Sequence, residues 1–375
     1  MMRIITLIKK EILHLIRDKA LIFILLWAFT GAVYTSGSGF TMEVIDFPTI
    51  IYDMSKTRES RELVSRFQKP YFKIISYIES EQELLQWLDS GKASMAVIIP
   101  PDFKRKMDKS SAKIQVIIDG TMSMSATVAV AYVSEITYDY AIEILERKMG
   151  TLNSFFKSLP VIEERTRVEF NPNTLSSWFM SMLEYFNMIT MVSLLVTAAA
   201  MVREKEHGTI EQLLVTPVRT WEIFIAKIIP TIFAIALLSL ISIYGVLKGV
   251  FNVPLRGSIL LFYPVMLFYA FTISSLGLAI STVARNLAQS MMLMLVILIP
   301  MLFLSGAWTP PESMQPLMRY LSLISPMRYF IDFGYSVLFK GNGIKYVWDD
   351  ILGIMVLGGM LFSFSVYRFR KIFAK

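Results

Sequence analysis

The sequence contains no cysteine and only two histidines, and it lacks the motifs of common catalytic sites. Without cysteine, no disulfide can stabilise an exterior domain, so such a domain must fold through its own core. No G-x-x-x-x-G-K-[ST] loop is present to hold nucleotide phosphates, and no G-x-S-x-G motif marks a nucleophilic serine. His14 and His207 are both predicted at the surface, and no His, Cys and carboxylate cluster has metal-ligand spacing. These absences argue against an enzyme, a directly bound cofactor and a metal site.

Charge is also missing from long stretches of this chain, of which 54% is apolar. A helix needs roughly 20 apolar residues, and at least about 17, to cross the hydrocarbon core of a membrane. Burying six such helices in a soluble protein would require far more chain than is available. The sequence therefore predicts six transmembrane helices. The stretches that carry no charge, or only Glu184, are 20–42, 171–202, 228–247, 257–284, 286–311 and 351–367.

Basic residues are distributed unevenly around these predicted spans. With a cytoplasmic N-terminus, the inner segments carry 14 Lys and Arg residues and the short outer loops carry 6. Cytoplasmic loops are enriched in these bases, whereas long domains cross regardless of charge. The balance therefore predicts that both termini are cytoplasmic. The net charge of +7 is explained by membrane orientation, and nucleic acid is not an expected partner.

Residues 1–19 predict a cytoplasmic helix that lies in the membrane surface. Its apolar residues fall near one face, and Lys9, Lys10 and Arg17 occupy the rest, a pattern typical of interfacial helices. A cleaved signal peptide is the alternative, although its charged region is normally shorter. The apolar residues are Ile4, Ile8, Ile12, Leu15 and Ile16.

Segment 43–177 predicts an extracytoplasmic α/β domain inserted between the first and second spans. Runs rich in Val, Ile and aromatic residues predict strands, and the stretches between them have helical patterns. The predicted strands are 45–52, 71–77, 93–99 and 114–118, and the predicted helices are 58–67, 81–88, 102–108 and 123–149. Residues 20–42 are predicted to form the first span, and residues 178–367 are predicted to contain the other five. Residues 368–375 would form a cytoplasmic tail.

The loop after the second predicted span, residues 203–222, is the most informative stretch. It begins R-E-K-E-H-G-T-I-E-Q-L-L-V-T-P. Gly208 permits a sharp turn, Thr209 can cap a new helix, and Ile210 begins an apolar edge along it. Such a helix would lie along the membrane surface with its charges facing the cytoplasm. The alternative is a solvated connector.

From Glu204 to Pro217 the chain matches every position of the pattern E-[RK]-E-x-G-T-x-E-Q-L-x-x-x-P, and in this it resembles the permease subunits of ABC-2 type exporters. The layout of one surface helix, one span, a large exterior domain and five further spans is similar to that of the drug-efflux subgroup. The resemblance implies that this loop is a coupling helix that docks on a separate ATPase. The residues to which it assigns coupling are Arg203, Glu204, Glu206, Gly208, Thr209, Glu211, Gln212, Leu213 and Pro217.

The resemblance also implies partners and a location. ABC ATPase subunits would bind ATP and Mg, and this chain would hydrolyse none. A second permease, identical or related, would complete the pathway in the lipid bilayer of the bacterial inner membrane, and a periplasmic adaptor could join outside. The resemblance does not identify the cargo, which would be moved out of the cytoplasm or the inner membrane. Drugs or other amphiphiles are one expectation, and lipids, glycans and peptides are the alternatives.

Three polar residues are candidates for the substrate pathway. Glu184 interrupts the second predicted span, and a charge within a membrane is costly and often functional. It would contact a cationic substrate or pair with Arg328, unless it lies at the membrane interface. Arg328 and Asp332 belong to the outer loop 306–350, where helix-breaking Gly and Pro, together with the resemblance, predict short re-entrant helices.

Two other functions remain as alternatives to an exporter subunit. A receptor or sensor would use segment 43–177 to bind a ligand, but it would leave five further spans without a role. A membrane enzyme acting on lipid would need polar catalytic groups clustered within the spans, and only Glu184 and Asp332 approach that.

Overall fold

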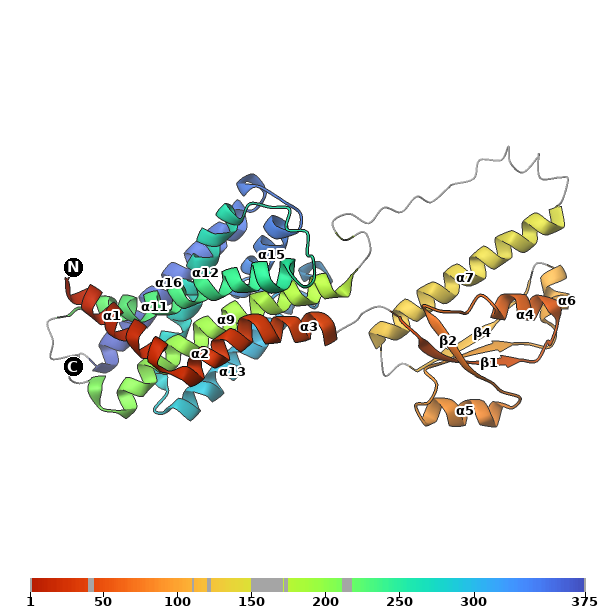
Figure 1. The fold of residues 1–375 in the computed structure, drawn as a ribbon, viewed down its shortest axis with the longest axis horizontal. Helices are drawn as coiled ribbons and strands as arrows, with labels where there is room; N and C mark the ends of the chain where they lie inside the picture. The colour runs from red at the N-terminus through yellow and green to blue at the C-terminus, as the bar shows by residue number, and fades with distance from the viewer. Residues whose placement is uncertain are drawn as a thin grey trace. The chain divides into compact units, whose positions relative to one another are not determined.

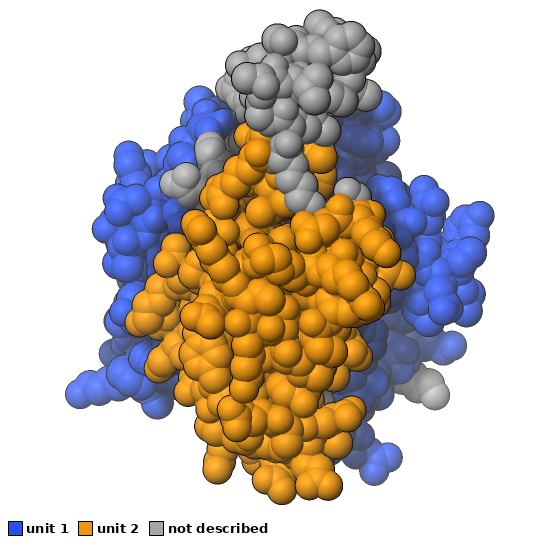
Figure 2. All heavy atoms as spheres, turned by 90° about the vertical axis from the view of Figure 1, so that its right-hand side faces the viewer, with its two compact units in different colours: residues 1–40, 169–375 blue, residues 41–168 orange. Residues whose placement is uncertain are grey.

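The computed structural model describes residues 2–39, 44–109, 111–119, 123–149, 171, 175–210 and 218–373. The chain divides into two compact units, shown in blue and orange in Figure 2. Unit 1 comprises residues 1–40 and 169–375, and unit 2 comprises residues 41–168.

Helices form unit 1 (Figure 1). A π-helical turn at Ala28–Ala32 joins α2 to α3, and another at Ser242–Lys248 extends α11. The α-helices are α1 (Met2–Arg17), α2 (Lys19–Trp27), α3 (Val33–Gly39), α9 (Ser176–Glu206), α11 (Thr220–Ile241), α12 (Ile259–Val283), α13 (Leu287–Phe303), α14 (Pro316–Ser322), α15 (Pro326–Leu338) and α16 (Trp348–Phe373).

Five helical segments in the described part of the chain are long and apolar enough to cross a membrane, which identifies unit 1 as a membrane bundle. They are Lys19–Gly39, Ser176–Glu206, Thr220–Lys248, Ile259–Val283 and Trp348–Ile372. The predicted fifth span corresponds to α13, which has 17 residues and is shorter than these five. Helix length therefore supports a helical membrane protein with several spans, but it does not by itself establish six.

Several helices extend beyond the spans predicted for them, because a charge-free run marks the apolar part of a helix and not its ends. The helix α9 continues past residue 202 to Glu206, and α16 continues past residue 367 to Phe373. The helix α11 begins at Thr220, eight residues before its predicted start at residue 228. Charged and polar residues extend these helices because backbone hydrogen bonds continue beyond the apolar segment.

The helix α9 is the most buried of the five candidate spans, and it runs through the centre of the bundle (Figure 1). Its aromatic residues pack against α12 and α15, where Phe186 lies 5.3 Å from Phe330 between ring centroids. Gly277 of α12 lies so close to α9 that a Cβ atom there would approach the carbonyl oxygen of Leu194 to 2.7 Å. The two helices are therefore closely packed along their middle.

One end of unit 1 has a small hydrophobic cluster of its own. It joins the end of α9, the turn after it, the start of α11 and the ends of α12 and α16. The helix α1 and the end of α16 lie at this same end of the unit (Figure 1). The buried members are Met201, Ile210, Phe224, Ile228, Leu278 and Phe369.

Residues 306–350, predicted as an outer loop, contain two helices, α14 and α15, and the 3₁₀ turns Pro311–Ser313 and Ile344–Tyr346. Proline occupies the first position of both α14 and α15, where its missing N–H needs no partner. The aromatic face of α15 packs on the bundle, and Phe330 stacks on Tyr269 of α12 with 3.9 Å between ring centroids.

Unit 2 is built around a four-stranded sheet with the order β2-β1-β3-β4. The strand β1 pairs in parallel with β2 and β3, and β4 pairs antiparallel to β3. The strands are β1 (Phe47–Asp53), β2 (Phe72–Tyr77), β3 (Met95–Ile99) and β4 (Gln115–Ile118), and the helices are α4 (Arg58–Val64), α5 (Glu81–Asp89), α6 (Phe103–Asp108) and α7 (Ser123–Met149).

The sheet of unit 2 has a hydrophobic core on each face, because successive strand residues point to opposite sides. Ile51 and Val97 lie in the larger core with α4 and the long helix α7. Ile50 and Ala96 face the other way, into a smaller core with α5. Figure 1 shows α7 and α5 on the two sides of the sheet.

Candidate functional site

The last turn of α9 carries four consecutive charged residues, Arg203, Glu204, Lys205 and Glu206. Successive residues of a helix point about 100° apart, so four in a row face four directions. Each of these side chains contacts a different part of unit 1, as the following contacts show. The end of α9 therefore serves as a junction for the helices around it.

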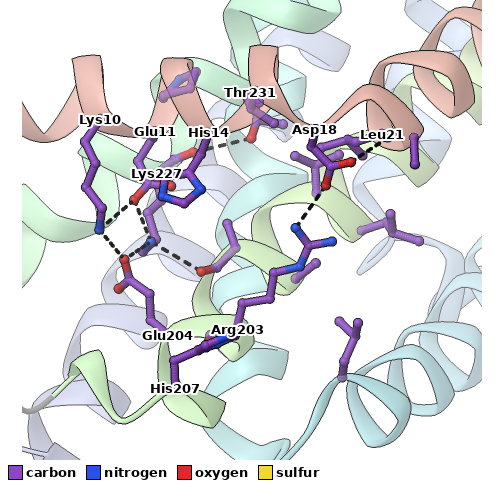
Figure 3. A pocket seen from close by; sticks show the side chains of 18 of the residues that line it. Lys10, Glu11, His14, Asp18, Leu21, Arg203, Glu204, His207, Lys227 and Thr231 are labelled. Carbon is purple, nitrogen blue, oxygen red and sulfur yellow. Dashed lines mark hydrogen bonds and ion pairs between the residues drawn. The ribbon is translucent and has the colours of Figure 1, made fainter.

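Glu204 belongs to a buried cluster of alternating charges (Figure 3). Its Oε1 accepts from Lys10 of α1 and from Lys227 of α11, both at 3.0 Å. Lys227 also reaches Glu11 at 3.0 Å and donates to the carbonyl oxygen of Ala200 at 3.3 Å. The Lys227 side chain is only 2% exposed. The carboxylates of Glu11 and Glu204 therefore take the place of the water molecules that would otherwise solvate its charge. The cluster joins α1, α9 and α11.

Arg203 ties the end of α9 to the connection between α1 and α2. Its guanidinium lies 3.3 Å from Asp18 Oδ2. Asp18 also caps α2, since its Oδ1 accepts the backbone N–H of Leu21 at 3.0 Å. That hydrogen bond and Arg203 together hold the pKa of Asp18 below its ordinary value.

Lys205 and Glu206 contact the short elbow between α12 and α13. Lys205 Nζ donates to the carbonyl oxygens of Ser281, Thr282 and Ala284, at 2.6, 3.3 and 3.0 Å. Glu206 Oε1 accepts the backbone N–H of Leu287, the first residue of α13, at 2.9 Å. Two adjacent side chains of α9 therefore hold the end of one helix and the start of the next.

Beyond α9 the chain turns sharply at Gly208, which has a φ of +67°. This left-handed backbone favours glycine, as the sequence predicted for a turn here. The Thr209 hydroxyl donates back to the carbonyl oxygen of Glu204 at 3.2 Å. Ile210 is buried in the hydrophobic cluster at this end of the bundle. The remaining predicted coupling residues, Glu211, Gln212, Leu213 and Pro217, lie outside the described residues.

A cavity of about 610 Å³ lies beside this junction, between α1, α2, α9, α11 and α13 (Figure 3). One part of its wall is apolar, with Leu21, Ile24, Leu195, Leu287 and Met291. The other part is polar and holds the paired charges described above, with the exposed rings of His14 and His207 beside them. Among the described side chains, Glu204 Oε2 is buried there without a hydrogen-bond partner. The cavity can therefore hold an amphiphile.

The charge of Lys10 is stabilised by its place in the cluster. Burial alone would lower its pKa, but the carboxylates of Glu204 and Glu11 outweigh that effect and raise the pKa above its ordinary value. Lys10 was predicted away from the apolar face of the first helix, where its side chain is 46% exposed and pairs with Glu204. Ile16, predicted on the apolar face, is 61% exposed because it lies one position beyond the stripe of Ile4, Ile8, Ile12 and Leu15.

The three candidate pathway residues do not form one site. Glu184 lies on α9, and its Oε2 accepts from Asn187 at 3.2 Å. Arg328 lies on α15, where its guanidinium donates to the Ser322 hydroxyl and, at 3.4 Å, to the carbonyl oxygen of Arg319. Among the described residues no ion pair joins Glu184 to Arg328, and Asp332 is exposed one turn further along α15.

Sequence reasoning identified Arg203, Glu204 and Glu206 but missed their partners. Lys227 was counted only as a cytoplasmic base, and Lys205 was given no role. One signal was available, because Lys227 lies inside an apolar helix and a base in that position needs an acidic partner. The partner itself could not be predicted, since Glu11 is 216 positions away in the sequence.

Comparison with known proteins agrees with this architecture. The sequence profile described as ABC-2 family transporter protein matches residues 20–367. The chain is 33% identical over 368 residues to the inner membrane transport permease YhhJ of Escherichia coli (strain K12), covering 96% of this chain and 95% of that protein. It is 32% identical over 372 residues to the probable multidrug ABC transporter permease YbhR of the same organism, covering 98% of each.

A third relative, the probable multidrug ABC transporter permease YbhS of Escherichia coli (strain K12), is 30% identical over 271 residues, which cover 70% of this chain and 69% of that one. All three are named as permeases, so neither the receptor nor the lipid enzyme gains support from them. The apolar helices and the inner-membrane relative identify a bacterial inner-membrane protein. The chain belongs to the ABC-2 family and is a transmembrane permease of an ABC exporter.

Proposed function

We propose that this permease exports amphiphilic compounds and that it receives them in the cavity beside the end of α9. The observation that carries the proposal is the composition of that cavity, which combines an apolar wall with a rim of paired charges. Its volume of about 610 Å³ suits one drug-sized molecule. Two of the relatives bear the word multidrug in their names, which is consistent with a cargo of this kind.

A separate ABC ATPase, which family membership implies, would supply the energy. It would bind ATP and Mg, and this chain would hydrolyse none. We assign its docking site to the part of the loop 203–217 that follows Gly208, because the charged side chains from Arg203 to Glu206 are already held within unit 1. Ile210 anchors the near side of the loop in the bundle. A displacement of the loop would therefore reach the cavity directly.

The topology that fits this function has six spans. The 17 residues of α13 are at the lower limit of a membrane-crossing helix, so α13 would be the fifth span. An even number of spans would place both termini on the same side of the membrane, and α1 and the end of α16 lie at one end of unit 1. The excess of Lys and Arg on that side would make it cytoplasmic. Unit 2, between the first two spans, would then be an extracytoplasmic α/β domain within segment 43–177.

The candidate pathway follows one stripe of α9. Glu184, Asn187, Met188, Met191 and Leu195 lie on the same side of this helix and are less buried than their neighbours. Glu184 lies about 28 Å from Arg203 along the helix, close to the thickness of the hydrocarbon core, so it would sit near the outer boundary. A carboxylate and an amide would not face lipid.

A second permease would cover that stripe and complete the pathway, either as an identical copy or as a related chain. Arg328 and Asp332 of α15 would belong to the outer exit. A periplasmic adaptor would contact unit 2 outside the membrane.

The proposal can be tested by placing a larger side chain on α13 so that it fills part of the cavity. Met291 lines it, whereas the adjacent Met292 is 69% exposed and does not. Met291→Trp should reduce export of the amphiphilic dyes rhodamine 6G and Nile red by about tenfold, a typical size for the loss of one well-packed binding contact. Met292→Trp, the matched control, should export both dyes normally. Equal export by the two variants, at equal amounts in the membrane, would show that the cavity does not receive cargo.

A further inference from the structure

The two contacts at the α12–α13 elbow match the electrostatics of the helix ends they touch. The last carbonyl groups of a helix carry partial negative charge, and the first N–H groups carry partial positive charge. Lys205 donates to the end of α12, and Glu206 accepts from the start of α13. Hydrogen bonds to charged groups are the stronger kind, so these contacts fix the elbow to the last turn of α9.

Of the two helices at the elbow, α12 is bound to α9 along its length. Gly277 packs directly against the backbone of α9 at Leu194. The Ser274 hydroxyl donates to the carbonyl oxygen of Ser193 at 3.3 Å. With Lys205 at its end, α12 is joined to α9 at the middle and at the elbow, so the two helices behave as one rigid body.

The helix α13 is held much more loosely. Only four of its 17 residues are buried, namely Ser290, Met294, Leu298 and Met301. Met292 and Val296 are the most exposed of its large apolar side chains, at 69% and 68% within unit 1. Its first residue is nevertheless bound to Glu206, and Leu287 and Met291 line the cavity. A helix that is loosely packed and held at one end can pivot about that end.

We infer that Lys205 and Glu206 are positioning residues that transmit movement of the end of α9 to the α12–α13 elbow. Lys205 keeps α12 with α9, and Glu206 steers the start of α13. Because α13 forms one wall of the cavity, its movement changes the width of the cavity. This inference rests on the proposed function, since it requires the ATPase to act on the loop.

The absence of cysteine allows a direct test. Leu195→Cys on α9 and Met291→Cys on α13 both line the cavity and form a reporter pair whose cross-linking can involve no other thiol of this chain. The chain is produced with its ATPase subunit, and cross-linking rates are compared in membranes with and without a non-hydrolysable ATP analogue. In the chain with Lys205 and Glu206 intact, the analogue should change the rate at least about fivefold.

Removing the contacts should abolish this response. In Glu206→Ala and Lys205→Met the rate should not change with the analogue, although the ATPase still binds to the chain. The matched control for Glu206 is Glu222→Ala, because Glu222 accepts an N–H only from its own helix start, at Arg219. The controls for Lys205 are Lys205→Arg, which can still donate to carbonyl oxygens, and Arg285→Met, which removes an exposed base from the same elbow.

The outcomes separate the inference from the proposed function. If Glu206→Ala and Lys205→Met respond to the analogue as the unsubstituted reporter does, the two residues do not transmit movement. If the unsubstituted reporter itself shows no response, the proposed coupling through the loop fails as well. Should Glu206→Ala reduce the amount of folded chain, Glu206→Gln replaces it. Gln keeps an acceptor for Leu287 but lacks the charge, and a weakened response is expected.

Discussion

Ion pairs of similar length have opposite surroundings in the two units. In unit 2, Lys56 and Glu79 lie 3.3 Å apart with side chains 72% and 85% exposed. In unit 1, Lys227 and Glu204 lie 3.0 Å apart with side chains 2% and 11% exposed. Water surrounds the first pair and screens it, whereas the second pair has exchanged its hydration for protein contacts. Distance alone therefore does not indicate what an ion pair contributes.

The comparison also explains why the three largely buried charges, Glu11, Glu204 and Lys227, are joined by the partly exposed Lys10 in a set of four. A single buried pair often contributes little net stability, because desolvation offsets the attraction. In the cluster, Lys227 lies between Glu11 and Glu204, and Lys10 contacts both carboxylates as well, at 3.7 and 3.0 Å. Each charge thus has neighbours of opposite sign, and the set is neutral overall. Removing one member leaves the others unbalanced.

The largest effect is expected for Lys227→Met. It leaves two carboxylates, Glu11 and Glu204, with only Lys10 to balance them. Breaking a buried ion pair from one side costs about 3–5 kcal/mol, which is a large part of the stability of most proteins. The thermal midpoint of the purified chain in detergent should fall sharply, and less folded chain should accumulate in the membrane.

The double variant Lys227→Met/Glu11→Leu shows whether charge is the cause. It removes one base and one acid and keeps the pair of Lys10 with Glu204. Most of the lost stability should return, because the remaining charges balance. A double variant as unstable as Lys227→Met alone would assign the loss to packing, and the contrast between the two units would disappear.

A smaller effect, dependent on pH, is expected in unit 2. Hydrogen bonds from Arg66 and Arg147 hold the pKa of Glu143 on α7 below its ordinary value of 4.5. A carboxyl whose pKa is lower in the folded state contributes its full stabilisation above its unfolded pKa. That contribution is lost as the pH falls through the folded pKa. Unit 2 should therefore loosen in acid, below about pH 4.5.

Hydrogen exchange of peptides from 123–149 in the full chain measures this loosening, after correction for the intrinsic pH dependence of exchange. In Glu143→Gln, protection at neutral pH should be slightly lower and its acid dependence shallower, because the titrating group is gone. If the variant and the unsubstituted chain show the same dependence, Glu143 is not the group responsible.

Sequence patterns predicted the elements of unit 2 closely, and they predicted the helix ends of unit 1 less well. The strand predicted at 45–52 is Phe47–Asp53, and the helix predicted at 123–149 is Ser123–Met149. Apolar runs bounded by turn residues define such elements at both ends. In unit 1 the same runs define only the lipid-facing middle of a helix, so α11 begins well before its apolar run.

The candidate site was predictable only in part, because a motif names residues and not their partners. The pattern from Glu204 to Pro217 begins in the last turn of α9. It could not show that Lys205 and Glu206 face the α12–α13 elbow, since that depends on where α9 ends and which helices surround it. The contact of Lys10 with Glu204, 194 positions apart, likewise depends on the packing of α1 against the bundle.

The smallest effect is expected for the exposed pair in unit 2. Lys56→Ala and Glu79→Ala should each change the stability of unit 2 by less than about 1 kcal/mol, and the coupling in a double-mutant cycle should be smaller still. High salt should remove it, because mobile ions screen exposed charges. The same salt should leave the defect of Lys227→Met almost unchanged, since ions do not reach a side chain that is 2% exposed. A coupling at Lys56 and Glu79 as large as that at Lys227 would mean that burial does not govern the difference between the two units.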